Sequence, residues 1–396
     1  MRQFNCVLIL IFFSLLMSCN KSNKISIQIP HFDLTGISKT SEVKLSELGV
    51  IDIQYIPLET NSSNLISRIK KIEANNNSFF IADRYKISKY AMDGSYINDI
   101  GTRGRGPNEY SIVLDFSTDS KNGQIFILNG TRSNGKIYIY SLNGSFIKSL
   151  SSPNYALNLA CVEDGLLCYL PDMDGIIDTS FVLIDYNGET KKGYSNKFPC
   201  HKKVHMPTGF LVDFLYYKYK NQLFIKENYS DTIFAFDNLS FKPAYVLNHG
   251  KKTLSPALRE QINSFEDFIQ VSSRICIVIS LFETQNFIYS EFIDEEQLYA
   301  FVGFRDVDAY FLLNAEKGIT NDIDGGPNIN FKMAKDENTV ISWINAFELK
   351  AHVASQAFKN SNPRYPEKKK ELEKLANNLK ENDNPVLMLV RLKKEE

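Results

Sequence analysis

The sequence has almost no excess of one charge, few histidines and a single tryptophan. Its 45 lysines and arginines are balanced by 46 aspartates and glutamates, so no nucleic-acid partner is expected, because such a partner calls for a basic excess. Only five histidines are available to converge on a metal. The cysteines show no C-x-x-C spacing and no G-x-S-x-G elbow occurs, which disfavours a zinc or redox site of that kind and a serine hydrolase.

Long apolar runs are also missing, apart from one near the start of the chain. The run from Cys6 to Met17 is too short to span a bilayer comfortably and is typical of a secretory signal. The segment Leu16-Met17-Ser18-Cys19, at the end of this run, resembles the bacterial lipobox, where the cysteine thiol takes a diacylglyceryl group. We predict that residues 1–18 are a cleaved signal peptide, that Cys19 is lipidated, and that residues 19–42 are a tether. An ordinary signal with an accidental cysteine, or an uncleaved anchor, are the other interpretations.

Four cysteines remain besides the signal and the anchor. An oxidising periplasm allows a disulfide, but the spacing does not say which cysteines pair. Cysteine also behaves as a small apolar residue, and buried thiols are expected for most of them. The four are Cys161, Cys168, Cys200 and Cys276.

Aromatic residues and tight-turn signals are what the chain has in abundance. The 28 phenylalanines and 20 tyrosines favour strands. A unit of four alternating runs recurs, with Asp-Gly or Asn-Gly turns at 93–94, 143–144 and 187–188. Four short strands per period of about 40–50 residues are typical of a propeller blade. The first four units cover 69–101, 110–150, 156–194 and 210–248.

The whole of residues 43–396 is therefore predicted to be one all-β, six-bladed β-propeller of four-stranded antiparallel blades. A helix is expected as an insertion near 253–273, and a charged surface helix near 366–382. The sixth unit is one strand short. We expect the lone strand at 49–59 to pair with the C-terminal strand at 385–392 and close the ring, since open edges invite aggregation.

Three motifs resemble a known family. These are QYIPLET (54–60), IGTRGRGPNEY (100–110) and ENDNPVLMLVRLKK (381–394). With the lipobox, they resemble the six-bladed β-propeller lipoproteins of Bacteroidetes, which are related to NHL-repeat propellers. Such proteins commonly have no assigned activity, and some are linked to outer-membrane uptake or signalling systems. Members often carry an acidic stretch after the lipidated cysteine, whereas this chain has NKSNK. The resemblance therefore implies the outer membrane and leaves its periplasmic face or the cell surface open.

The glycine-rich segment 101–110 contains the candidate ligand-binding residues Arg103, Arg105 and Glu109. A phosphate loop would be followed by a helix, but a strand follows here, so an inter-blade connection is the preferred reading. The two guanidinium groups near the axial opening can bind a carboxylate or sulfate bidentately. Pairing with Glu109 or with a neighbouring blade is the simpler alternative.

A metal site has weak support. His201 and His205 have a spacing that suits zinc only on a helix, and the nearby prolines favour a solvated basic loop. No metal and no cofactor are predicted, although structural calcium in the channel stays open, with Asp83, Asp115 and Asp213 as residues to inspect. Their simpler role is turn formation or binding of inner-strand amides.

Two functions follow from the architecture. The first is a non-catalytic binding or scaffold module of the cell envelope, a monomer held at the membrane only by its lipid, which engages a glycan, peptide or partner protein at the axial face. The second is a propeller enzyme: a metal-dependent lactonase, a glycan lyase or hydrolase, or a peptidyl lyase. An enzyme would need at least three imidazoles or carboxylates around one point, and the scarcity of histidine favours the binding module.

Overall fold

The computed structural model describes residues 29–394, except 36–39, 131–133, 174, 202–212 and 306–308. The predicted signal peptide, the lipidation site at Cys19 and His205 lie outside the described residues. Within the described part of the chain, no helix has both the length and the apolar character needed to cross a membrane.

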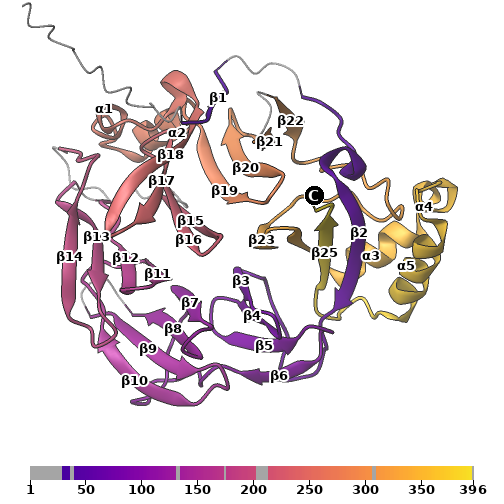
Figure 1. The fold of residues 1–396 in the computed structure, drawn as a ribbon, viewed down its shortest axis with the longest axis horizontal. Coiled ribbons are helices and arrows are strands. Elements are labelled where there is room, and N and C mark those ends of the chain that lie inside the picture. Colours follow the sequence, from indigo (N-terminus) through magenta and orange to yellow (C-terminus); the bar gives the residue numbers. More distant parts are fainter. Residues whose placement is uncertain are drawn as a thin grey trace, which may run out of the picture.

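Six sheets are arranged in a ring around one axis, as Figure 1 shows, which confirms the predicted six-bladed propeller. Blade 1 holds β3 (Lys71–Ala74), β4 (Ser78–Ala82), β5 (Ile87–Ala91) and β6 (Tyr96–Asp99). Blade 2 holds β7 (Asp115–Asp119), β8 (Gln124–Asn129), β9 (Lys136–Ser141) and β10 (Phe146–Ser151). Blade 3 holds β11 (Asn158–Val162), β12 (Gly165–Tyr169), β13 (Thr179–Ile184) and β14 (Thr190–Ser195).

The second half of the ring is less regular. Blade 4 holds β15 (Phe214–Tyr219), β16 (Gln222–Glu227), β17 (Thr232–Asp237) and β18 (Ser240–Asn248). Blade 5 holds β19 (Ile277–Glu283), β20 (Phe287–Asp294), β21 (Gln297–Phe304) and β22 (Tyr310–Asn314). Blade 6 holds β23 (Met333–Asp336), β24 (Thr339–Ile344), β25 (Val386–Leu392) and β2 (Val50–Pro57).

Aspartate-glycine and asparagine-glycine turns define the outer hairpins, as the sequence predicts. Gly94 has φ +90° in the β5–β6 turn, and Gly144 has the same φ in the β9–β10 turn. A side chain at Gly94 would also place its Cβ 2.2 Å from the carbonyl oxygen of Pro57. Glycine is therefore needed there both for the left-handed backbone and for the close approach of β2.

The ring closes through the two ends of the chain. β2 pairs antiparallel with β25, with Tyr55 opposite Met388, so the predicted closure strand is confirmed. Asn384, just before β25, donates from Nδ2 to the carbonyl oxygens of Glu59 (2.8 Å) and Asn64 (3.1 Å), and its Oδ1 accepts from the backbone N–H of Ile66 (2.9 Å). Two of the family-like motifs, around 54–60 and 381–394, are thus parts of one closure.

Aromatic side chains fill the interfaces between blades. Tyr169 of blade 3 stacks on Phe214 of blade 4 with ring centroids 4.5 Å apart. Phe181 meets the same ring edge-on at 5.5 Å. Such pairs bury large apolar area and add about 0.5–1.5 kcal/mol each beyond that burial. The high aromatic content is therefore used mainly for packing.

The helical insertions differ in detail from the prediction. The helical insertion expected near 253–273 is confirmed, but it consists of two short helices, α1 (Pro256–Arg259) and α2 (Phe265–Ser272), after a 3-10 turn η2 (Gly250–Lys252). Ser264 Oγ accepts from the N–H of Asp267 and starts a new helix, which interrupts the run.

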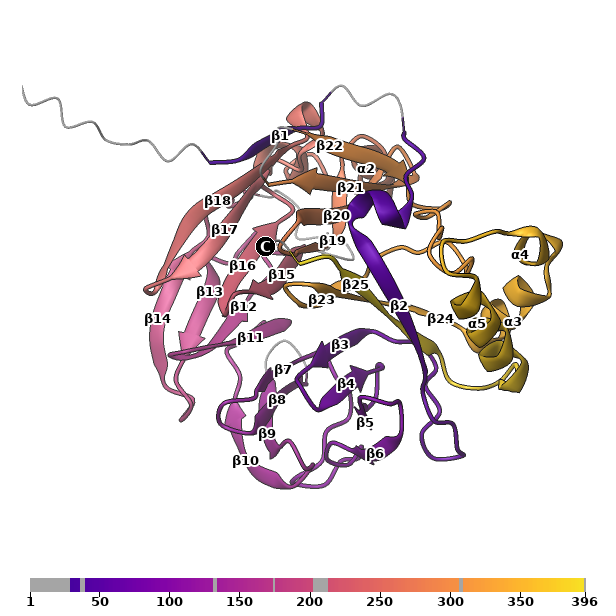
Figure 2. The same ribbon diagram turned by 45° about the vertical axis from the view of Figure 1, so that its right-hand side comes forward.

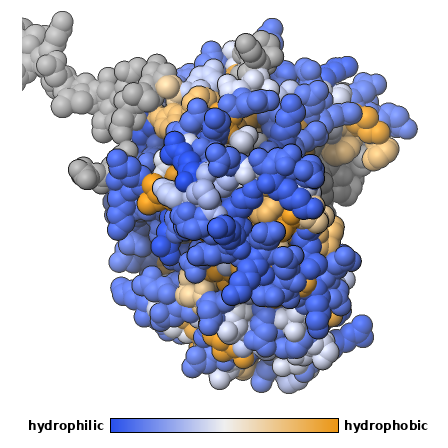
Figure 3. Space-filling model, turned by 90° about the vertical axis from the view of Figure 1, so that its right-hand side faces the viewer, coloured by the Kyte–Doolittle hydropathy of each residue, from blue (hydrophilic) through white to orange (hydrophobic). Residues whose placement is uncertain are grey.

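Blade 6 carries the other helices. The charged segment forms α5 (Pro366–Asn378), and the surface over this helical group is largely hydrophilic in Figure 3, as expected for a solvated face. Two further helices, α3 (Ala346–Ala354) and α4 (Gln356–Asn360), were not predicted. The sequence pattern indicated only that this stretch belongs to the sixth unit. The signal was Asn345 followed by Glu348, a capping box at the end of β24.

A fifth strand extends blade 4. β1 (His31–Asp33), within the segment expected to be a tether, pairs parallel with β18, with Phe32 opposite Leu247. Figure 2 shows β1 running beside β18 at the rim of the ring. A 3-10 turn, η1 (Leu45–Leu48), then leads into β2.

All five α-helices of the described chain lie on one face of the ring. Neighbouring strands in a blade are antiparallel, so the connections between second and third strands reach the same face as the connections between blades. The segments 249–276 and 345–385, which carry α1–α5, are both connections of this kind. We call this side the insertion face.

Candidate functional site: the mouth of the central channel

The first strands of the six blades, β3, β7, β11, β15, β19 and β23, lie nearest the axis (Figure 1). These strands enter the channel from the insertion face, because each follows an inter-blade connection. Their first residues therefore form the mouth of the channel on that face. Lys71 begins β3 and Asp115 begins β7.

Lys71 is the centre of a polar network that joins four blades. Its Nζ lies 2.8 Å from Asp115 Oδ1 and 3.2 Å from Glu73 Oε1, and it also donates to Tyr216 Oη and to the carbonyl oxygen of Phe116. Tyr216 Oη in turn donates to the carbonyl oxygen of Leu159 at 2.7 Å. Blades 1, 2, 3 and 4 are thereby connected across the channel.

Nearly all polar atoms of the Lys71 network have hydrogen-bond or ion-pair partners. Asp115 Oδ2 accepts from the N–H of Leu159 at 3.0 Å and lies 3.2 Å from Tyr216 Oη. Removal from water opposes the charge on Lys71, but Asp115, Tyr216 and Glu73 together hold the pKa of Lys71 well above its ordinary value. Burial, with Asp115 beside it, raises the pKa of Tyr216. The mouth therefore holds a lysine that stays charged and a phenol that stays protonated.

The glycine-rich segment 101–110 is the connection from blade 1 to blade 2, as predicted. Gly101 has φ +68°, and a Cβ there would lie 2.5 Å from the Tyr140 ring. Tyr110 is fully buried and its hydroxyl donates to the carbonyl oxygen of Ile100 at 2.8 Å. Glu109 Oε2 accepts from the N–H of Gly106 at 2.8 Å, so this carboxylate closes its own loop.

Arg103 does not pair with Glu109. Its guanidinium carbon lies 4.1 Å from the centroid of the Tyr85 ring, and that of Arg84 lies 5.7 Å from the same ring. Among the described residues, no carboxylate lies within ion-pair distance of Arg84, Arg103 or Arg105. We call Arg84, Tyr85 and Arg103 the arginine shelf. Arg105 is exposed on the same loop, but the structure does not bring it to Tyr85.

The arginine shelf borders the channel mouth. The N–H of Val113, two residues before β7, donates to the carbonyl oxygen of Arg84 at 2.9 Å. Lys70, next to Lys71, donates to the carbonyl oxygens of Val113 (2.9 Å) and Leu114. Burial lowers the pKa of Lys70, and the neighbouring Lys71 and Arg84 lower it further. Positive charge is thus concentrated where blades 1 and 2 meet.

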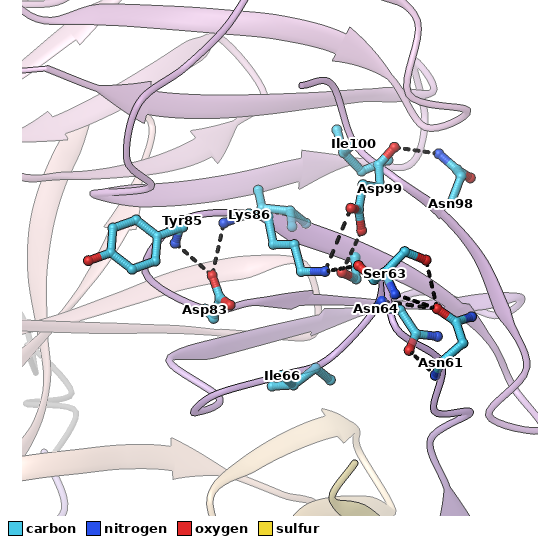
Figure 4. Close-up of polar contacts among 12 residues, drawn as sticks. Asn61, Ser63, Asn64, Ile66, Asp83, Tyr85, Lys86, Asn98, Asp99 and Ile100 are labelled. Atoms are coloured by element: carbon cyan, nitrogen blue, oxygen red, sulfur yellow. Dashed lines mark hydrogen bonds and ion pairs between the residues drawn. The ribbon is translucent and has the colours of Figure 1, made fainter. Parts of the chain in front are cut away.

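The aspartates considered for calcium have other partners. Asp83 Oδ1 accepts from the N–H groups of Tyr85 (2.6 Å) and Lys86 (2.9 Å), which Figure 4 shows within the β4–β5 turn. Asp115 belongs to the Lys71 network. In the parts of the chain that the structure describes, no three His, Cys, Asp or Glu side chains are arranged to hold a metal ion. Structural calcium stays an untested prediction.

The remaining predicted residues lie apart from the channel mouth. His201 is exposed, and its N–H donates to Glu260 Oε1 at 3.1 Å. Lys86 of blade 1 donates to the carbonyl oxygen of Ser63 at 2.8 Å, and this contact holds the segment that follows β2 (Figure 4). The Lys86 ammonium also lies 3.7 Å from the Asp99 carboxylate. The four cysteines are buried, as expected for most of them: Cys161, Cys168, Cys200 and Cys276.

Sequence reasoning missed Lys71, Tyr216, Arg84 and Tyr85. Lys71 stands in the run RIKKIEA, where a lysine enters a short strand with buried neighbours. A charge at an inner strand is a signal for a buried partner. The partner itself, Asp115, is 44 residues away, and no local pattern connects the two.

These features define a closed six-bladed propeller whose channel mouth is crossed by a charged network and bordered by arginines that have no carboxylate partner in the described part of the chain. The model of the family described as "Domain of unknown function (DUF4934)" matches residues 29–391, and the chain belongs to this family. No curated protein sequence matches it. The kinship with NHL-repeat propellers stays a prediction.

Two solved structures from Bacteroides are similar to this chain. One, from Bacteroides fragilis NCTC 9343, bears the name of an exported protein; it has 18% sequence identity and a TM-score of 0.68, with 92% of this chain and 99% of that chain covered. The other is a member of the DUF4221 family from Bacteroides vulgatus ATCC 8482, with 13% identity and a TM-score of 0.49, covering 87% and 97%. At these identities, the first likeness supports the fold alone.

Proposed function

We propose that this protein is an exported, lipid-anchored, non-catalytic binding module of the bacterial envelope that holds an anionic group of a glycan, peptide or partner protein at the arginine shelf. The observation that carries the proposal is the state of Arg103. Its guanidinium stacks on the partly exposed ring of Tyr85 and has no carboxylate partner among the described residues. A guanidinium oriented in this way is ready to bind a carboxylate or sulfate.

The charges inside the channel support binding in preference to catalysis. The carboxylates of Asp115 and Glu73 are both held by Lys71, and Glu73 Oε2 also accepts from the N–H and the hydroxyl of Thr118, each at 2.7 Å. A general base needs a lone pair directed at the substrate. Here the lone pairs are directed at strand amides and a lysine. Arg84 and Arg103, which have no carboxylate partner among the described residues, lie outside, on the shelf.

Binding at the shelf is tested with the detergent-solubilised full chain on an array that pairs sulfated and carboxylated glycans with their neutral counterparts. We expect binding of anionic members only, weakened by salt. Arg103→Gln and Arg84→Gln should each weaken it about tenfold or more, since charge-assisted hydrogen bonds contribute about 1.5–3 kcal/mol. Arg274→Gln, an exposed arginine on the same face, is the matched control. Equal binding of neutral glycans, or unchanged binding by both shelf variants, would contradict the proposal.

The anchor has a separate test. Metabolic labelling with a radioactive or clickable fatty acid should label the wild-type chain in the envelope fraction, because Cys19 would carry acyl chains. Cys19→Ser should lose the label and leave the membrane, whereas Cys6→Ser should keep both. Export would follow from the protein's presence outside the cytoplasm, and protease accessibility in intact cells would decide between the periplasmic face and the surface of the outer membrane. A labelled Cys19→Ser chain would exclude this anchor.

A further inference from the structure

A second cavity lies away from the channel, between blades 4 and 5 on the insertion face. Its volume is about 350 Å³, within the range of small-molecule sites. Its walls come from the segment after β1, from the start of the β18–β19 connection, and from β20, β21 and β22. None of the channel-mouth residues lines it.

His249 is the one histidine in the lining of this cavity. Its side chain is 5% exposed. Nδ1 lies 3.0 Å from Asp231 Oδ1, and Asp231 is not part of the cavity wall. Nε2, on the other side of the ring, is buried without a hydrogen-bond partner. A buried polar atom left without a partner costs about 1–3 kcal/mol. A ligand atom that displaces the side chains covering Nε2 would supply the missing bond.

The groups around the His249 ring determine whether Nε2 donates or accepts a hydrogen bond. Burial opposes the charge on Asp231, but hydrogen bonds from His249 and from Thr253 Oγ1 (2.7 Å) hold the pKa of Asp231 below its ordinary value, so it stays a carboxylate. A carboxylate only accepts, so Nδ1 carries the proton. Burial also lowers the pKa of His249 and keeps the ring neutral. Nε2 is therefore an acceptor and calls for an O–H or N–H donor.

The other residues that line the cavity limit the kind of ligand that it suits. Phe292 and Tyr299 are stacked with ring centroids 5.7 Å apart, and Leu34 and Leu312 complete an apolar wall. The Lys252 ammonium lies 2.8 Å from Asp294 and 3.0 Å from Glu295, and Lys251 also lines the cavity, so two ammonium groups balance two carboxylates. The cavity thus suits an uncharged molecule with an apolar face and hydroxyl donors.

We propose that this cavity is a binding site for a single sugar unit, oriented by a hydroxyl group that donates to His249 Nε2 and by contact with the Phe292–Tyr299 wall. His249 is the recognition residue, and Asp231 is a positioning residue that holds the proton on Nδ1. β1 completes the site: the N–H of Leu34 donates to the carbonyl oxygen of Asn248 at 2.8 Å and holds the outer wall against the His249 connection. The proposal is independent of the arginine shelf.

The test is isothermal titration of the full-length protein in detergent with a panel of neutral mono- and disaccharides, at concentrations up to about 10 mM, which reaches the weak affinities expected of so small a ligand. At least one saccharide is expected to bind. Asp231→Asn should reduce its affinity at least tenfold, because an amide N–H opposite Nδ1 moves the proton to Nε2. Leu312→Trp, which fills the cavity, should abolish binding. Asp237→Asn, at a partly exposed aspartate of the same blade, is the matched control and should bind as the wild type does.

Nitrogen NMR of the histidine ring supplies a readout that does not depend on these variants. We expect an unprotonated Nε2 in the free protein that shifts when the saccharide is added. Absence of binding by every saccharide, a proton on Nε2 in the free wild-type protein, or unchanged binding by Leu312→Trp would each overturn the proposal. None of these results would affect binding of anionic glycans at the shelf, so the two sites are tested separately.

Discussion

At the scale of single residues, the protein places charges in two ways. Lys71 is surrounded by opposite charge and keeps its proton. Glu227, at the end of β16, is 6% exposed, and the attraction of Lys197, Arg259 and Lys226 does not outweigh its removal from water. Burying a charge without a close partner is unfavourable, and the group answers with a shifted pKa. Removing the charge of Lys71 should therefore destabilise the protein, whereas removing the charge of Glu227 should stabilise it.

Replacing Lys71 by methionine should destabilise the protein strongly. The variant leaves Asp115, which is 5% exposed, without its cation, and such losses cost on the order of 3 kcal/mol. The measurement is the free energy of unfolding in urea. Lys191→Met removes an ion pair with Asp164 in which both side chains are about half exposed, and it should change stability by less than about 0.5 kcal/mol. Equal effects of the two variants would show that the Lys71 network contributes little.

Replacing Glu227 by glutamine should stabilise the protein above neutral pH. Burial raises the pKa of Glu227 to about 7, from the ordinary 4.5. Between these values the folded state binds the proton more tightly than the unfolded state, so stability falls as pH rises from about 4.5 to about 7 and stays reduced above that. At about 1.4 kcal/mol per pKa unit the penalty at pH 8 is ~3 kcal/mol.

The check on Glu227 is urea unfolding near pH 4 and near pH 8. Glu227→Gln should gain stability relative to the wild type at the higher pH and change little at the lower one. Glu266→Gln, on the exposed side of α2, should show no such dependence. A stability difference between Glu227→Gln and wild type that does not vary with pH would rule out this carboxyl as the cause.

At the scale of elements, blade 6 depends most on long-range contacts. Its β23, β24 and β25 come from the last part of the chain, its β2 comes from the first, and three helices are inserted between β24 and β25. β2 cannot find its register from a short hairpin. The register is instead specified by the pairing with β25 and by Asn384, which is 2% exposed and binds three backbone groups of the segment after β2.

Asn384→Ala should therefore loosen the closure. Three backbone groups of the closure segment would lose their side-chain partner, which we expect to cost about 3 kcal/mol in the free energy of unfolding. Hydrogen exchange should show faster exchange confined to β2 and its neighbours. Asn122→Ala, in an exposed turn of blade 2, should cost less than about 0.5 kcal/mol. Faster exchange spread evenly over all six blades would contradict a local role for Asn384.

At the scale of the whole molecule, the ring makes the blades interdependent. Each blade is a thin sheet that buries both faces only between its neighbours, and the Lys71 network adds a connection between four blades across the axis. A closed ring of this kind should unfold as one unit, because opening any interface exposes two faces.

The single tryptophan offers a direct check of this cooperativity. Trp343 lies on β24, in the blade that closes the ring. Its fluorescence and the far-UV circular dichroism of the whole chain should follow the same urea transition. A Trp343 transition at clearly lower urea would mean that blade 6 opens before the rest. A chain ending before residue 385, which lacks β25, should lose the coincidence and expose apolar edge surface.

From the amino-acid sequence alone it was possible to predict the repeating unit, the outer hairpin turns, the number of blades and the pairing of 49–59 with 385–392. These features depend on alternation and on Asp-Gly or Asn-Gly turns, which act over a few residues. The sequence also identified the segment 101–110 as an inter-blade connection, because a strand follows it.

Which side chains meet depends on the tertiary fold and could not be predicted. Lys71, Asp115 and Tyr216 come from three blades and lie up to 145 residues apart, and their contact depends on how the blades are set around the axis. The stacking of Arg103 on Tyr85, the parallel pairing of β1 and the His249 cavity have the same origin. Backbone preferences are local, whereas binding sites are assembled from distant segments, so the first can be read along the chain and the second cannot.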